Sequence, residues 1–220
     1  MEEKNISERE SLLLIQQMIN TAKKEQKDDG LGWIVWGWLL FSASLLTVAN
    51  LHFNWFGNFF FWNMFGLATI LIFAYRAVAR FFSKRVERVK TYTGDLFAKL
   101  NIGFFICLMF IIVAMNVGTK IISEKQGVTD LTIINLGFAL LINLYAFWAL
   151  IYGTALSFKP SVIGAYCTWA IGLAALFAQD FEKVMWLQAL AVLAGYLIPG
   201  QLANYQFRKL RKAEKANARV

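Results

Sequence analysis

Five asparagines supply most of the amide chemistry within the apolar segments of this 220-residue chain: Asn63, Asn101, Asn116, Asn135 and Asn143. Asn135 and Asn143 lie eight residues apart, about two helical turns, so we expect them to share a helix face. Such amides can line a pocket for a small neutral or lipid-like solute. They can also hydrogen-bond one membrane helix to another, at about 0.6 to 2 kcal/mol per contact. Both interpretations stay open, and helix–helix bonding is favoured.

Side chains that could do acid–base, metal or nucleophilic chemistry are scarce. His52 is the only histidine, and the two cysteines, Cys107 and Cys167, lie within apolar segments, where we expect small buried residues. A zinc site or a disulfide framework needs more of these residues. No charged residue falls centrally in an apolar segment, although ion-coupled carriers usually keep one there to bind the coupling ion. The sequence therefore predicts a non-enzymatic protein without a cofactor or metal, and disfavours an ion-coupled carrier.

The apolar segments themselves indicate a membrane protein. Residues 31–75 contain no Lys, Arg, Asp or Glu, and this run is about twice the length that crosses a bilayer. Only 16% of the chain is charged, against about 25% in soluble domains. The sequence predicts an all-α polytopic membrane helix bundle of six transmembrane helices, at residues 31–51, 56–82, 100–118, 131–152, 161–178 and 184–202.

The basic residues predict how these helices are oriented. Nineteen of the 22 Lys and Arg residues flank the predicted spans on the side of the two termini, and only Lys120, Lys125 and Lys183 lie on the other. Cytoplasmic loops of membrane proteins carry the excess of Lys and Arg. We therefore expect a bacterial inner-membrane protein with both termini in the cytoplasm.

Two basic clusters adjoin the predicted spans on the cytoplasmic side. They comprise Lys84, Arg85, Arg88 and Lys90 in an inner loop, and Arg208, Lys209, Arg211 and Lys212 in the tail. Each Lys or Arg near an anionic lipid surface contributes about 1 kcal/mol of attraction. The clusters can anchor the topology or contact anionic headgroups. We expect no nucleic-acid partner, because these residues adjoin apolar spans and residues 1–30 are net acidic.

Residues 7–28 have the pattern of an amphipathic helix. Ser7 and Glu10 form a capping box, and an apolar stripe follows at helical spacing: Leu12, Ile15, Ile19 and Ala22. Residues 1–30 carry seven acids and five bases, whereas membrane-surface helices are usually rich in bases. We therefore favour contact with a protein over the membrane surface. The expected domains are a cytoplasmic helix at 1–30, the membrane domain at 31–207 and a basic tail at 208–220.

Small residues recur at four-residue intervals in the fifth predicted span, at Gly164, Thr168 and Gly172, and the sixth contains Ala191 and Gly195. Small residues at this spacing let helix backbones approach closely. The seam can lie inside the bundle or form a homodimer interface, and internal packing is favoured.

The stretch Glu8-Arg-Glu-Ser-Leu-Leu-Leu-Ile-Gln-Gln-Met-Ile, the Asp28-Asp29-Gly30 break and Trp36-Gly37-Trp38 resemble uncharacterised six-span inner-membrane proteins of Bacteroidota. The resemblance implies the topology and no site residues, because that family has no assigned activity. The sequence thus predicts an interaction or regulatory protein that acts through its cytoplasmic helix and basic loops. The alternative is a transporter or channel for a small neutral or lipid-like solute.

Overall fold

The computed structural model describes residues 29–57, 59–82, 92–126, 131–178 and 180–217. These residues form helices joined by short turns and contain no strand, so the all-α prediction is confirmed for them. The helices are α2 (Leu31–Phe53), α3 (Phe60–Phe82), α4 (Tyr92–Gln126), α5 (Thr132–Ala155), α6 (Lys159–Leu176), α7 (Phe181–Val192), the π-helical turn η1 (Leu193–Leu197) and α8 (Ile198–Asn217). The predicted helix at 7–28 and the basic loop residues 84–90 lie outside the described residues.

The turn between α2 and α3 explains why the second helix begins four residues later than predicted. The buried side chain of Asn50 donates from Nδ2 to the Phe56 carbonyl at 2.9 Å and accepts the Phe56 N–H on Oδ1 at 2.9 Å. Asn54 ends α2 in the left-handed conformation, with φ 51°. These bonds hold residues 54–57 in a turn, and α3 begins only at Phe60.

Helix α4 extends eight residues beyond the predicted span at each end. Its last turns are polar, and Lys120 Nζ lies 3.9 Å from Glu124 Oε1, one turn further on. Ion pairs between residues four apart stabilise a helix where its side chains are polar. The hydropathy of the sequence therefore located the most apolar part of α4 but not the ends of the helix.

Among the described residues, four helices are long and apolar enough to cross a membrane: Leu31–Phe53, Lys99–Lys125, Thr132–Ala155 and Phe181–Ala213. Helix α3 is apolar only over Phe60–Ile72, and its second half carries Arg76 and Arg80. Helix α6 is 18 residues long, and its Gly, Ser, Thr and Lys residues dilute its apolar character. Four of the six predicted spans are therefore supported by length and composition.

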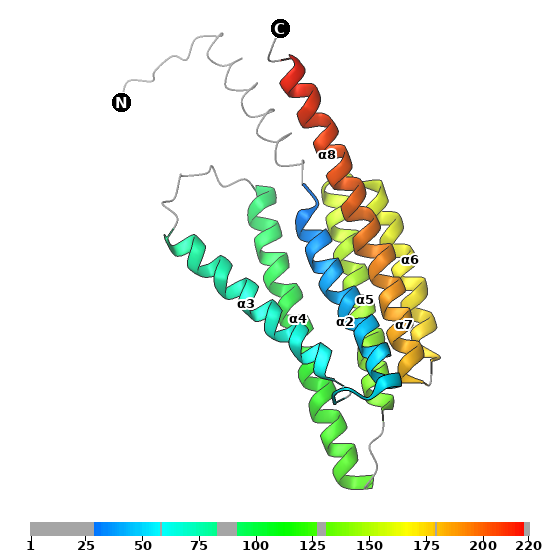
Figure 1. The fold of residues 1–220 in the computed structure, drawn as a ribbon. Coiled ribbons are helices and arrows are strands. Elements are labelled where there is room, and N and C mark those ends of the chain that lie inside the picture. The colour runs from blue at the N-terminus through cyan, green and yellow to red at the C-terminus, as the bar shows by residue number, and fades with distance from the viewer. Residues whose placement is uncertain (1–28, 58, 83–91, 127–130, 179, 218–220) are drawn as a thin grey trace.

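The last three elements join end to end in one helical rod, Phe181 to Asn217, which we call the C-terminal rod. It packs against α2, α5 and α6, while α5 and α6 form a closely packed hairpin. Helix α4 packs on α5, and α3 packs on α2 and leans away from the bundle (Figure 1).

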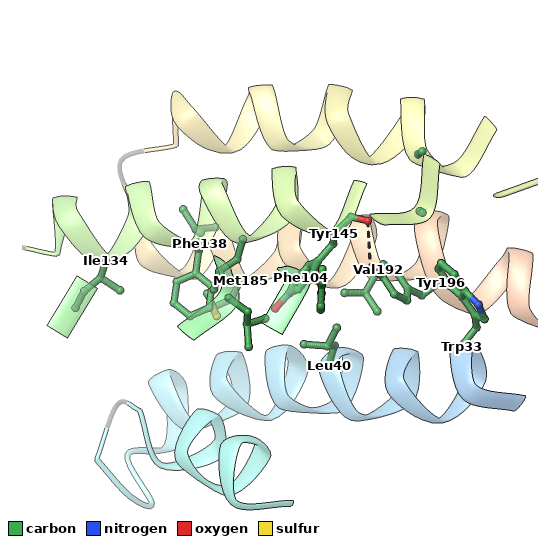
Figure 2. Close-up of a cluster of buried hydrophobic side chains, with 14 of the residues drawn as sticks. Trp33, Leu40, Phe104, Ile134, Phe138, Tyr145, Met185, Val192 and Tyr196 are labelled. Carbon is green, nitrogen blue, oxygen red and sulfur yellow. Dashed lines mark hydrogen bonds between the residues drawn. The ribbon is translucent and has the colours of Figure 1, made fainter. Parts of the chain in front are cut away.

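The core lies where α2, α4, α5 and the C-terminal rod meet. Figure 2 shows Leu40, Phe104, Tyr145, Met185 and Val192 side by side in this cluster. Leu40 and Met185 have no exposed surface. In a bilayer such contacts stabilise the bundle through close packing, since lipid tails are as apolar as these side chains.

The small-residue seam lies inside the bundle, as the sequence favoured. A Cβ on Gly164 would lie 2.5 Å from the Ala194 carbonyl oxygen, and one on Gly195 would lie 2.5 Å from Thr168 Oγ1. A Cβ on Gly172 would lie 3.0 Å from Ile142 of α5. Helix α6 uses this face to contact its neighbours within the chain. Pairing with a second copy through another face stays a prediction.

Candidate functional site

The structure distributes the five asparagines over different surfaces. Asn135 is buried, whereas the other four are exposed: Asn63 on α3, Asn101 and Asn116 on α4 and Asn143 on α5. They do not form a single enclosed lining. Eight residues of α-helix turn through slightly more than two turns. That excess moves Asn143 away from the buried face on which Asn135 lies.

Two of the exposed asparagines bond within the protein. Trp169 Nε1 of α6 donates to Asn143 Oδ1 at 2.6 Å, which joins α5 to α6. Asn116 Nδ2 donates to the Ile112 carbonyl of its own helix at 2.8 Å. The Asn143 bond is of the helix–helix kind that the sequence favoured.

The remaining reactive side chains lie on the surface. Cys107 and Cys167 are free thiols and are exposed, so the expectation that they are buried is wrong: both point away from the helix seams. His52 Nε2 lies 3.2 Å from Glu182 Oε1, and both side chains are largely exposed. Across the described ranges, no three His, Cys, Asp or Glu side chains gather as metal ligands.

Gln188 is a buried polar residue that the sequence analysis missed. It has no exposed surface, and neither Nε2 nor Oε1 has a hydrogen-bond partner in the described part of the chain. Val184 and Ala191, one turn before and after it, are also buried. The spacing Val184–Gln188–Ala191 was therefore the available signal, because it places the amide on the apolar face of α7.

Helix α2 contributes two further polar side chains to the core near Gln188. Ser44 and Thr47 have no exposed surface, and their hydroxyls donate to the carbonyls of Leu40 and Ala43 at 2.9 and 2.7 Å. The antiparallel register of α2 and the C-terminal rod is fixed by His52 against Glu182 at one end and by Gly37 against Leu197 further along. This register puts Gln188 level with residues 44–47, in a polar layer across the middle of the bundle.

The π-helical turn η1 lies in the same rod, about one turn further on. Thr168 Oγ1 of α6 lies 2.8 Å from the Gly164 carbonyl and 3.2 Å from the Ala191 carbonyl, just before η1. Tyr196 Oη donates to the Tyr145 carbonyl at 3.2 Å. π-Bulges insert one residue into an α-helix and often occur at functional sites. Here the wider turn is held by bonds from α6 and to α5.

The basic cluster of α8 forms an exposed surface at one end of the molecule. Arg208, Lys209, Arg211 and Lys212 are all exposed, and none makes an ion pair with another described residue. At 100° per residue these four cover one broad face of the helix. Phe207 and Leu210 lie on its other side. We call residues 203–217 the α8 extension, and Figure 1 shows it projecting beyond the ends of α2, α5 and α6.

The chain is fixed to the base of the α8 extension where it enters α2. Asn204 Nδ2 donates to the Asp29 carbonyl at 2.7 Å. Gly30 adopts φ 68°, and a Cβ there would lie 2.5 Å from the Gly200 carbonyl oxygen. Asp29 Oδ1 accepts the Leu31 N–H at 3.0 Å and so satisfies one free donor at the start of α2. Residues 29 and 30 therefore lie directly on α8.

The exposed basic helix and the enclosed polar layer are the two features that can serve a function. Comparison of the chain with known protein families, curated proteins and solved structures finds no match.

Proposed function

We propose that this chain is a six-span protein of a bacterial inner membrane that acts without catalysis, as an interaction or regulatory protein. Its working surface is the cytoplasmic end, where both termini lie. The proposed working surface comprises the α8 extension, the basic loop residues Lys84, Arg85, Arg88 and Lys90, and the segment 7–28. The marked excess of Lys and Arg on this side supports the orientation.

The α8 extension has the length and charge needed to work at a lipid surface. Residues 181–202 are enough to cross a bilayer, so the following 15 residues project about 22 Å at about 1.5 Å per residue. Arg208, Lys209, Arg211 and Lys212 are exposed within this part. Anionic headgroups, or an acidic protein held at the membrane, are the partners that such a cluster attracts.

The lipid partner is tested on the full-length protein purified in mild detergent, by mass spectrometry of the co-purified lipids. Replacing Arg208, Lys209, Arg211 and Lys212 by glutamine should lower retained phosphatidylglycerol and cardiolipin at least tenfold, since each cation contributes about 1 kcal/mol. Phosphatidylethanolamine should not change. The control variant Lys120→Gln/Lys125→Gln/Lys183→Gln alters the opposite side and should retain the wild-type lipids. Equal anionic-lipid retention in the two variants would contradict the proposal.

A second candidate function is passage of a small neutral solute. The polar layer of Ser44, Thr47 and Gln188 favours it, because an amide enclosed without a partner can bond a passing molecule. If the protein passes a neutral solute, Gln188 faces the path of that solute. If the protein is an interaction or regulatory protein, Gln188 is only a buried residue of the core. Replacement of Gln188 by leucine separates the two.

A further inference from the structure

We propose that the outward face of the α5–α6 hairpin is the surface through which two copies of this chain pair within the membrane. The contact is centred on Asn143 of α5, and the partner is a second copy in the same orientation. This inference rests on the proposed membrane location of the chain. It does not depend on how the α8 extension acts.

Asn143 leaves part of its amide unsatisfied on the outer surface of the bundle. Its Oδ1 accepts the Trp169 Nε1 hydrogen at 2.6 Å, whereas its Nδ2 has no hydrogen-bond partner among the described residues. Tyr166 of α6 is 60% exposed, and its Oη likewise bonds to no described residue. The Tyr166 and Trp169 rings lie 5.9 Å apart, so the three side chains form one group, which we call the midplane cluster.

The midplane cluster lies at the depth where a bilayer contains least water. Helix α5 runs from Thr132 to Ala155, so Asn143 lies at its centre, and the bond to Trp169 brings α6 to the same level. Hydrocarbon offers no hydrogen-bond partner, so polar side chains at this depth usually contact another helix. The rest of the outward face is apolar, with four exposed side chains: Leu136, Leu140, Phe147 and Leu173. The free N–H and O–H groups therefore favour a partner that brings polar groups to the same depth.

A second copy of the chain meets this requirement through its own midplane cluster. Two copies oriented by the same excess of Lys and Arg lie parallel in the membrane, so a twofold axis along the membrane normal brings residues of equal depth together. Asn143 Nδ2 of one copy can then donate to Asn143 Oδ1 or Tyr166 Oη of the other, and symmetry repeats the bond. The cluster is uncharged and contains both donors and acceptors, so it is complementary to itself. A lipid tail offers neither.

The sides of the hairpin that face the bundle are already covered within the chain. Gly164 of α6 lies against the C-terminal rod, Gly172 lies against α5, and Met115 of α4 covers Gly137 of α5. Cys167 is also exposed, but at 100° per residue it lies about 160° around α6 from Trp169. Cys167 therefore marks a surface at the same depth that points away from the midplane cluster.

Pairing is measured on the full-length protein in liposomes, by Förster transfer between copies that carry a donor or an acceptor on an added C-terminal cysteine. The background is Cys107→Ala/Cys167→Ala, and dilution with lipid gives the Kd. Asn143→Ala should raise this Kd at least about fivefold, because symmetry removes two bonds from each dimer. The matched control Asn116→Ala removes an exposed amide that bonds its own helix on α4, and should leave the Kd unchanged.

A further variant separates pairing from packing within one copy. Trp169→Phe removes the bond between α5 and α6 but keeps Asn143, so the Kd should stay within about twofold of the wild-type value. An equal rise in Trp169→Phe and Asn143→Ala would overturn the proposal, because Asn143 would then act only by joining α5 to α6. Wild-type protein that shows no transfer at any dilution would also overturn it. The lipid-retention test of the α8 extension would be unaffected by either result.

Disulfide trapping keeps Asn143 intact and so tests the same face without the risk of misfolding. With a membrane-permeant oxidant, the single cysteine Leu140→Cys, one turn from Asn143, should give a disulfide-linked dimer. The matched control retains only the native Cys167 and should react at least about tenfold more slowly, because a disulfide requires Cα atoms within about 7 Å. Equal rates at the two positions would indicate random collision and overturn the proposal. A disulfide between Leu140→Cys and a different protein would assign the face to that protein instead.

Discussion

Gln188 is the residue whose environment fits its chemistry least. An amide without a partner in an enclosed core costs about 1 to 3 kcal/mol relative to a satisfied one. The residue is level with the hydroxyls of Ser44 and Thr47, but both hydroxyls already donate to their own helix. The Gln188 amide therefore either only lowers the stability of the fold or serves to contact a solute.

Replacing Gln188 by leucine, which has a similar volume, should raise the free energy of unfolding by about 1 to 2 kcal/mol. For a chain of this size that corresponds to a rise in Tm of about 2 to 8 °C, measured in detergent. Gln201→Leu, exposed on the same rod, is the control and should leave Tm unchanged. If the protein passes a neutral solute, Gln188→Leu should also reduce glycerol entry into proteoliposomes to the rate of empty vesicles. A lower Tm with unchanged glycerol entry would contradict both roles.

At the scale of elements, the approach of α6 to the C-terminal rod depends on Gly195. Its missing side chain makes room for Thr168, which bonds the carbonyl before the π-helical turn. Gly195→Ala should lower the free energy of unfolding by about 1 to 3 kcal/mol, because overpacking forces the helices apart. Gly103→Ala is the matched control: nothing lies within 4 Å of its added Cβ, so Ala should stabilise the helix by up to about 1 kcal/mol.

Thermal unfolding in detergent checks this prediction, and a double variant tests its cause. Thr168→Ala removes the hydroxyl that a Cβ on Gly195 would meet, so adding it should recover part of the stability lost in Gly195→Ala. Equal losses in the single and double variants would mean that the contact with Thr168 is not what makes glycine necessary.

The sequence was sufficient to predict the helices, because hydropathy and the rarity of proline act locally along the chain. It placed α2 within two residues of its observed end, but missed the start of α3, because the bonds of Asn50 to Phe56 join residues across a turn. The seam at Gly164 and Thr168 could be recognised from spacing alone. The site could be predicted only in part. Which face of α5 holds Asn143, and how Gln188 is enclosed, depend on packing between distant helices.

At the scale of the whole molecule, the proposed orientation, with both termini in the cytoplasm, predicts that the two ends of the bundle differ in access. In a cysteine-free background, Ala213→Cys on the α8 extension should react with a membrane-impermeant maleimide only after the inner membrane is opened. Glu124→Cys, at the far end of α4, should react from outside while that membrane is intact. Both residues are exposed, so access alone decides the rates. Labelling of both cysteines from outside would contradict the placement of the termini in the cytoplasm.

The C-terminal rod runs from α7 through η1 into α8, so α8 can act as the long arm of a lever. The rod is about 55 Å long at about 1.5 Å per residue, and the bonds of Thr168 and Tyr196 hold it about 15 to 22 Å from its Phe181 end. A tilt of about 10° around that fulcrum moves the tip of α8, about 33 Å away, by about 6 Å. A movement of the short arm, whose end carries Glu182 beside His52, would therefore be amplified and reversed in direction at the tip of α8.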